Sequence, residues 1–141
     1  MFFLRKLQNE RTLQRIYIGH GHPITRYRQS IAYSEAQVIQ QHERILASIA
    51  VQLPEAIHRH MYGLLVATSE RLLFITSSRH YGSFFDIYPY DTIEQLRTRR
   101  LKQTEIVLRF RRMEKVFIVS FVDERLSEFR QVIRAQMQPS S

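Results

Sequence analysis

The sequence predicts a mainly β fold. Seven antiparallel strands form a small barrel or sandwich, a C-terminal helix caps it, and a helical extension precedes it. One observation is the stretch 62–76, where two apolar runs flank a polar turn. A second is the series of short strand-like segments after this stretch, with no helical pattern between them. The third is the apolar stripe at helical spacing over 124–137.

The stretch 62–76 is interpreted as a β-hairpin that is covered on both faces. Leu64 to Ala67 lead into the turn at Thr68 to Arg71, and Leu72 to Ile75 lead out of it. A strand with one solvated face alternates apolar and polar residues, whereas these runs are apolar at nearly every position. We therefore expect the hairpin at the centre of the fold, with the rest of the chain covering it.

A helix is expected over residues 2–17, because apolar residues recur among basic ones. Phe2, Phe3 and Leu7 in its first turns have two interpretations. They pack on the barrel or on a second copy of the chain, or they lie in a membrane interface. Residues 18–29 follow as a loop, because glycine and proline interrupt the helical pattern.

A second helix is expected from Ser30 to Arg44, because Ser34 and Gln37 resemble a capping box ahead of apolar residues. Ile45 to Leu53 is apolar and compatible with β structure, so we interpret it as the first strand. A continuing helix is the alternative for so alanine-rich a run.

The second half of the chain supplies four more strands and the closing helix. The strands are expected at 84–88, 92–99, 104–111 and 115–122. Alternation makes the segment 104–111 half-buried, with Arg109 and Arg111 on its open face. Asp123 is a good N-cap for the helix, whose apolar stripe is Leu126, Phe129, Ile133 and Met137. Residues 138–141 are expected to form a disordered tail.

A chain of 141 residues with 44% hydrophobic residues can build one domain with a substantial core. Its longest apolar runs are four to five residues, whereas roughly 20 are needed to span a bilayer. The absence of cysteine excludes disulfides and thiolate metal sites. We therefore expect a soluble cytoplasmic protein.

The net charge of +8 is concentrated in two segments. Residues 1–28 carry six basic residues and one glutamate, and residues 97–115 carry eight basic residues and two glutamates. Such segments suit an anionic membrane surface, nucleic acid or an acidic protein, or serve only as a solvated surface.

Three motifs carry a resemblance to a known family. They are Glu43-Arg44-Ile45-Leu46, the hairpin Gly63 to Ile75 with its Thr68-x-x-Arg71 turn, and Pro89-Tyr90-Asp91-x-Ile93. Together they resemble the bacterial PH-like domains, in particular the YokE-like group. The resemblance covers 43–137 and leaves 1–42 as a helical extension. It implies a PH fold of two roughly orthogonal antiparallel sheets, which serves as a binding scaffold and not as an enzyme.

In the eukaryotic relatives, basic residues in the loops after the first, third and sixth strands meet at the open end and hold phosphate. The expected binding residues are the cations of the equivalent loops, by this resemblance, together with those of the basic segment 97–115, by its concentrated charge. They are Arg59, Arg79, Arg99, Arg100, Lys102, Arg111, Arg112 and Lys115.

Other kinds of site find less support in the sequence. The pairs His20 with His22 and His58 with His60 lack a supporting carboxylate or cysteine at ligand spacing, so no metal site is predicted. No glycine-rich phosphate loop or nucleophile motif is present, so neither catalytic residues nor a cofactor are predicted.

The leading hypothesis is a non-enzymatic PH-like binding module in a bacterial or phage cytoplasm, which acts through contacts with an unidentified protein or with its own copies. The first alternative is peripheral binding to anionic lipid at the inner membrane face, through the basic loops and the N-terminal helix. The second alternative is nonspecific binding of nucleic acid.

Overall fold

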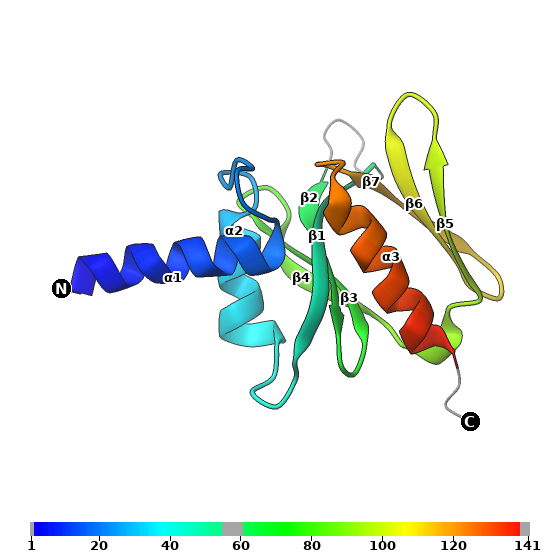
Figure 1. Cartoon of the computed structure of the whole chain (residues 1–141), viewed down its shortest axis with the longest axis horizontal. Helices are drawn as coiled ribbons and strands as arrows, with labels where there is room; N and C mark the ends of the chain where they lie inside the picture. The colour runs from blue at the N-terminus through cyan, green and yellow to red at the C-terminus, as the bar shows by residue number, and fades with distance from the viewer. Residues whose placement is uncertain (1, 55–60, 139–141) are drawn as a thin grey trace.

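Seven antiparallel strands form one sheet in the order β4-β3-β2-β1-β7-β6-β5, and the helix α3 packs between the two halves of the sheet (Figure 1). The computed structural model describes residues 2–54 and 61–138, with side chains from residue 9 onward. The strands are β1 (Ile45–Leu53), β2 (Met61–Thr68), β3 (Leu72–Ser78), β4 (Gly82–Tyr88), β5 (Gln95–Arg100), β6 (Thr104–Arg109) and β7 (Glu114–Val119). The helices are α1 (Phe2–Tyr17), α2 (Arg28–Tyr33) and α3 (Glu124–Met137). A π-helical turn (Ser34–Val38) continues α2, and a 3-10 turn (Tyr90–Thr92) precedes β5.

The expected mainly β fold with its capping helix is confirmed, but the two sheets are continuous. β1 pairs with β2 along its length and with β7 through Val51 and Gln52, so one strand belongs to both halves. The two roughly orthogonal sheets that the resemblance implies are therefore the two halves of one sheet that passes through β1.

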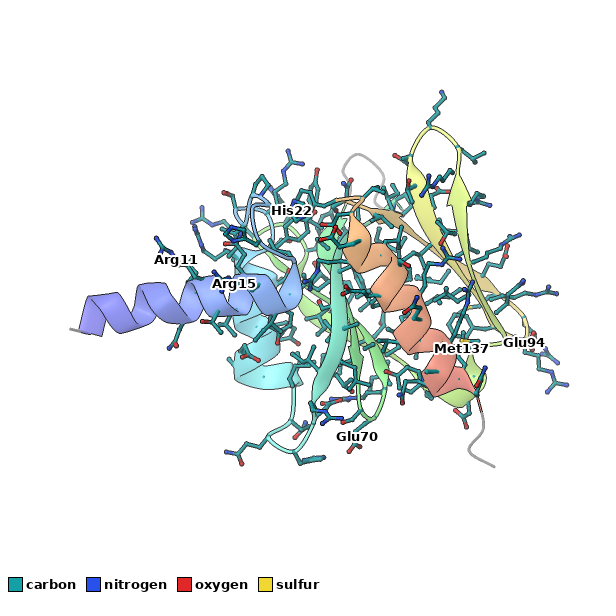
Figure 2. All side chains as sticks on the ribbon, viewed as in Figure 1. Arg11, Arg15, His22, Glu70, Glu94 and Met137 are labelled. Atoms are coloured by element: carbon teal, nitrogen blue, oxygen red, sulfur yellow. The ribbon has the colours of Figure 1, made fainter. Side chains whose placement is uncertain are left out.

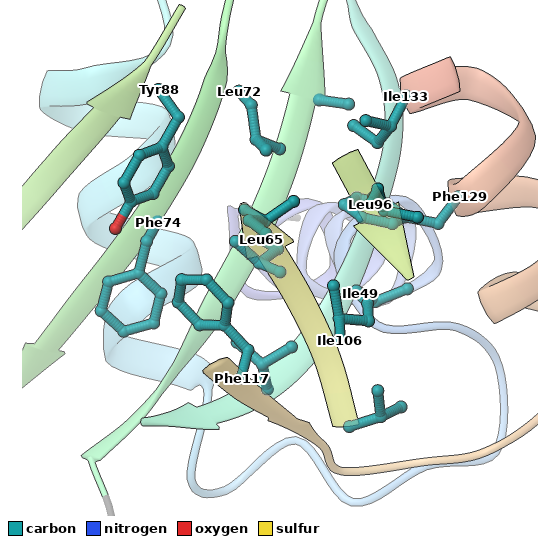
Figure 3. Packing of buried hydrophobic residues seen from close by; sticks show 14 of the residues in the cluster. Ile49, Leu65, Leu72, Phe74, Tyr88, Leu96, Ile106, Phe117, Phe129 and Ile133 are labelled. Atoms are coloured by element: carbon teal, nitrogen blue, oxygen red, sulfur yellow. The ribbon is translucent and has the colours of Figure 1, made fainter. Parts of the chain in front are cut away.

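The interior core lies between the two halves of the sheet and α3. Phe74 of β3, Phe117 of β7 and Phe129 of α3 are completely buried there (Figure 3). The Phe74 and Phe117 ring centroids are 5.4 Å apart. Asp123 caps α3 as predicted, because its Oδ1 accepts a hydrogen bond of 2.9 Å from the Arg125 backbone N–H. The C-terminal helix thus closes the core that the apolar strands build.

A second apolar cluster covers the opposite face of β1, β2 and β3. The N-terminal part of the chain contributes Tyr17, Ile18, Tyr27, Ile31 and Val38 to it. The strands contribute Ala50, Leu64, Val66, Leu73 and Ile75. The central hairpin is therefore covered on both faces, as its unbroken apolar runs predict. The segment from Tyr17 to Val38 packs on the same sheet and supplies that cover.

The helix predicted over residues 30–44 forms only as far as Val38, and the prediction is wrong for residues 39–44. Helical structure ends at Val38, and Ile39 adopts an extended conformation. Ser34 does not cap a helix, because it lies buried between α2 and the π-helical turn, where its hydroxyl donates to the Ser30 carbonyl at 2.7 Å. The chain then turns and buries Glu43. Residues Ile45–Leu53 form the strand that we expected.

Several strand boundaries differ from the prediction. β5 begins at Gln95, because Thr92 belongs to the 3-10 turn, where its backbone N–H donates to the Pro89 carbonyl. β6 ends at Arg109, because the Phe110 N–H donates to the Met113 carbonyl and closes a turn. β7 ends at Val119 and not at residue 122.

Gly63 marks a close approach between β2 and its neighbours. A Cβ atom at this position would lie 2.6 Å from the Ile75 carbonyl oxygen and 2.8 Å from the Phe74 ring. We expect Gly63→Ala to lower the free energy of unfolding by about 1–3 kcal/mol, because backbone of β3 must shift. Urea denaturation of wild type and variant measures the effect, and an unchanged midpoint would contradict it.

Candidate functional site

The strands β5, β6 and β7 present a basic outer face. Leu96, Ile106 and Phe117 point into the core, so alternate residues of the same strands point outward. Arg97, Arg99 and Arg109 are outward-facing, and we call them the basic face. β5 is also the last strand of the sheet, so this face lies at a sheet edge.

Two of these arginines are held by glutamates, Arg99 by one on the neighbouring strand β6 and Arg97 by one on β7, across β6. Arg97 Nη2 lies 3.0 Å from Glu114 Oε2, and Arg99 Nε lies 2.8 Å from Glu105 Oε1. Exposed pairs of this kind add at most about 1 kcal/mol of stability, but they fix the direction of the guanidinium groups. Arg109 is exposed and has no acidic partner among the described residues. The basic face therefore presents one unpaired guanidinium beside two oriented ones.

The β5–β6 turn and the β6–β7 turn each combine cations with an exposed apolar side chain. In the β5–β6 turn, Leu101 is 74% exposed and lies between Arg100 and Lys102. In the β6–β7 turn, Met113 is 56% exposed and follows Arg111 and Arg112.

The β6–β7 turn also contains a shallow open hollow of about 560 Å³ that Arg109 to Glu114 line. Lys115 follows at the start of β7, where it pairs in register with the core residue Leu108 and is half-buried. Of the predicted binding cations in this region, Arg111 and Arg112 are thus the accessible ones.

The structure places the cations of the basic segment 97–115 at two opposite ends of β6. Glu105 pairs with Ile118, and Ile118 pairs with Gln52, so the β5–β6 turn lies toward the C-terminal end of β1. The β6–β7 turn lies at the other end of β6, about 17 Å away for a six-residue strand. Arg99, Arg100 and Lys102 are therefore separated from Arg111 and Arg112.

The remaining predicted contact residues lie elsewhere. Arg79 is exposed in the turn between β3 and β4. Arg59 lies outside the described residues. Phe2, Phe3 and Leu7 are part of α1, but their side chains are outside the described ones.

The two basic segments of the chain form separate surfaces. Figure 2 places Arg11 and Arg15 on α1 and Glu94, just before β5, at the opposite end of the molecule. Figure 1 shows the same separation between α1 and the β5–β6 hairpin. A partner with one flat surface therefore does not contact both segments at the same time.

A buried ion pair organises the turn between β2 and β3. Glu43 Oε2 lies 2.8 Å from Arg71 Nε and accepts a hydrogen bond of 2.5 Å from the Thr68 hydroxyl. The Glu43 side chain is only 1% exposed. Burial alone would raise its pKa, but the hydrogen bonds from Arg71 and Thr68 outweigh burial and lower the pKa to about 2. The same hydrogen bond raises the pKa of Arg71.

Sequence reasoning recognised these residues only as family motifs. The Tyr90 hydroxyl donates to the carbonyls of Thr68 and Arg71, at 2.6 and 3.1 Å. The Thr68-x-x-Arg71 turn and the Pro89-Tyr90-Asp91 segment are therefore one hydrogen-bonded unit. Burial raises the pKa of Tyr90, so its hydroxyl stays protonated and serves this structural role.

The N-terminal segment is held to the connection between β7 and α3. His22 Nε2 lies 2.6 Å from Asp123 Oδ2, and the imidazole stacks on Phe121 with ring centroids 4.3 Å apart. The Tyr27 hydroxyl donates to Ser120 Oγ at 2.5 Å. His22 thus joins the segment before β1 to the connection between β7 and α3.

No three metal-ligating side chains come together within the described residues.

None of the helices that the structure describes is long and apolar enough to cross a membrane. No curated protein matches the chain.

Solved structures share its fold. A pleckstrin homology domain from Shewanella amazonensis SB2B is 14% identical with a TM-score of 0.51, and the match covers 96% of this chain and 99% of that one. The C-terminal domain of an unknown protein from Leishmania infantum is 16% identical with a TM-score of 0.53, covering 68% and 86%. The Vps36 N-terminal PH domain is 15% identical with a TM-score of 0.51, covering 70% and 82%.

These likenesses show the fold, and a fold by itself does not determine a function. The family assignment comes from a family model, described as bacterial PH domain, that matches residues 39–135. This match spans more than half of the chain and contains the whole sheet and most of α3. The chain therefore belongs to the bacterial PH domain family.

Proposed function

We propose that this protein is a non-enzymatic binding module that docks on an acidic surface of another protein through its basic face. The observation that carries the proposal is the arrangement of Arg97, Arg99 and Arg109 on neighbouring strands. Two of the guanidinium groups are held by glutamates, and the third has no acidic partner among the described residues. A carboxylate of a partner can therefore pair with Arg109 without breaking an existing ion pair.

The geometry of arginine favours a protein carboxylate as the ligand. A guanidinium group presents its donors in a planar fork that matches a carboxylate in a bidentate way. Orientation matters for such a contact, and a rigid sheet fixes it better than a loop does. The net charge of +8 also favours approach of an acidic partner.

The test compares two single charge reversals on the full chain. Arg109→Glu changes the basic face, and Arg11→Glu makes the same charge change on α1 at the opposite end of the molecule. We expect acidic proteins captured by the wild type, identified by mass spectrometry, to bind Arg11→Glu equally well and Arg109→Glu about tenfold less. Equal capture by all three forms would overturn the proposal.

Peripheral binding to an anionic membrane is the second candidate, and the exposed Leu101 and Met113 favour it. Each lies among cations, and apolar and basic residues together make an interfacial anchor. A cation near an anionic surface contributes about 1 kcal/mol, and burial of a leucine about 1.5–3 kcal/mol. Vesicles of phosphatidylserine and phosphatidylcholine should then retain wild type but release Leu101→Ser. Absence of binding to these vesicles would exclude this candidate.

A further inference from the structure

The strand β1 has an edge that other strands cover only in part. β2 pairs with it from Ile45 to Leu53, whereas β7 pairs only with Val51 and Gln52. One more backbone hydrogen bond joins the Ser120 N–H to the Ala50 carbonyl, at 3.1 Å. On the side of β7, the first half of β1 therefore has no strand partner among the described residues.

A β-bulge adds to this open edge. The register of β1 on β2 shifts between Ile45 and Ala47, so Leu46 has no residue opposite it on β2. The extra residue of a bulge is left unpaired in its ladder. An open strand edge of this kind is a template for pairing with another chain unless something covers it.

A cleft of about 350 Å³ lies along this part of β1. Ile45 to Ser48 form its floor, Arg15 and Ile16 of α1 form one wall, and α3 forms the other. In Figure 1, β1 runs between the C-terminal end of α1 and the helix α3. The open edge is therefore the base of a channel between two helices.

Arg125 of α3 closes one end of the cleft. Its guanidinium group donates to the carbonyls of Arg15, Ile16 and Ser48, at 3.0, 2.7 and 2.8 Å. At Ser48 a side chain thus satisfies an edge carbonyl that a strand would otherwise satisfy. The open part of the edge is left at residues 45–47.

The walls indicate what kind of segment the cleft suits. Ile16 is 41% exposed, which is unusual for so large an apolar side chain, and Val132 faces the same cleft from α3. Arg15 is exposed and makes no ion pair among the described residues, whereas the Arg125 guanidinium is already engaged. Glu128 is the acidic residue of the lining. An apolar side chain and a carboxylate directed at Arg15 complement this lining.

We propose that the cleft binds an extended acidic segment of a partner protein, which adds as a short strand to the edge of β1 at residues 45–47. Main-chain hydrogen bonds hold the segment in such a complex, and side-chain contacts select it. An apolar residue of the segment packs on Ile16 and Val132, and a carboxylate pairs with Arg15. The site is distinct from the basic face and does not depend on the proposed function.

A second copy of the chain does not fit as the occupant. Paired strands lie about 4.8 Å apart, so an added strand must enter between α1 and α3. A strand edge of a folded copy carries its neighbouring strands and helices with it, and the two walls exclude them. A single extended segment brings no such bulk.

The test uses a peptide library displayed on phage and selected on the full chain, with counter-selection on Ala47→Arg, which fills the cleft. Selected peptides are then synthesised, and their affinities for wild type, Arg15→Glu and Arg109→Glu are measured. We expect acidic peptides with alternate apolar residues, about tenfold weaker on Arg15→Glu and unchanged on Arg109→Glu. Backbone amides in 45–48 should exchange more slowly with solvent when the peptide is bound.

Several outcomes would overturn this proposal. They are no enrichment over the counter-selected variant, protection of amides on β5 to β7 instead of β1, or protection of β1 that rises with protein concentration alone. Arg15 is exposed, so Arg15→Glu keeps the fold and remains informative if Ala47→Arg disturbs β1. Loss of binding on Arg109→Glu but not on Arg15→Glu would indicate that the peptide binds to the basic face.

Discussion

Replacement of Arg71 by alanine should lower the free energy of unfolding by about 3–5 kcal/mol at neutral pH. Arg71 Nε lies 2.8 Å from Glu43 Oε2, and the Glu43 side chain is 1% exposed. Without Arg71, a carboxylate remains buried with only the Thr68 hydroxyl and the Gln40 N–H to stabilise its charge. Urea denaturation at pH 7 measures this loss.

The same pair predicts how stability depends on pH. The folded-state pKa of Glu43 is lowered to about 2, below its ordinary value of 4.5. The unfolded chain therefore binds the proton first as pH falls. The contribution of the pair, about 3 kcal/mol, is complete above pH 4.5 and is lost as pH falls toward 2.

In Arg71→Ala, burial is no longer opposed by the guanidinium group, so the pKa of Glu43 rises. The difference in stability between wild type and variant should then narrow between about pH 4.5 and 2. Glu43→Gln provides the matched control, because it removes the charge and keeps the size. A double-mutant cycle isolates the coupling between the two residues. A difference that stays constant over this pH range would contradict the assignment.

Phe117→Ala should be about as destabilising, at about 3–5 kcal/mol. Phe117 is completely buried on β7, and its ring contacts Phe74 of β3 and Tyr88 of β4, with centroids 5.4 and 6.2 Å apart. β7 and β3 belong to different halves of the sheet, so this cluster joins the halves through the core (Figure 3). Thermal unfolding monitored by circular dichroism measures the loss.

Phe117→Leu is the matched control, because it keeps most of the apolar volume and should cost less than half as much. A small effect of the alanine variant would mean that the halves are joined mainly through β1 and α3. That result would contradict the role given to the aromatic cluster.

Several elements follow from short stretches of sequence. The hairpin of β2 and β3 is recognisable because its apolar runs do not alternate, and α3 because Asp123 precedes an apolar stripe at helical spacing. These patterns depend on residues that are near one another in the chain. The local patterns agree with the structure because their apolar residues are buried in the interior core and in the second apolar cluster.

The helix predicted over 30–44 ends early, at Val38, for the opposite reason. Ser34 and Gln37 match a capping box locally, but Ser34 lies inside the helical segment and is buried. The chain must leave the helix to place Glu43 against Arg71, which is 28 positions later. A contact so distant in sequence leaves no periodic signal where the helix ends.

The candidate sites divide in the same way. The sequence by itself determined a bacterial PH domain with a strong positive charge and identified its basic segments. Only the tertiary structure decided that α1 and β5 to β7 lie apart, that β6 separates the two basic turns, and that α1 and α3 enclose the open edge of β1. These arrangements depend on strand register and on contacts between distant residues, which pattern and composition do not encode.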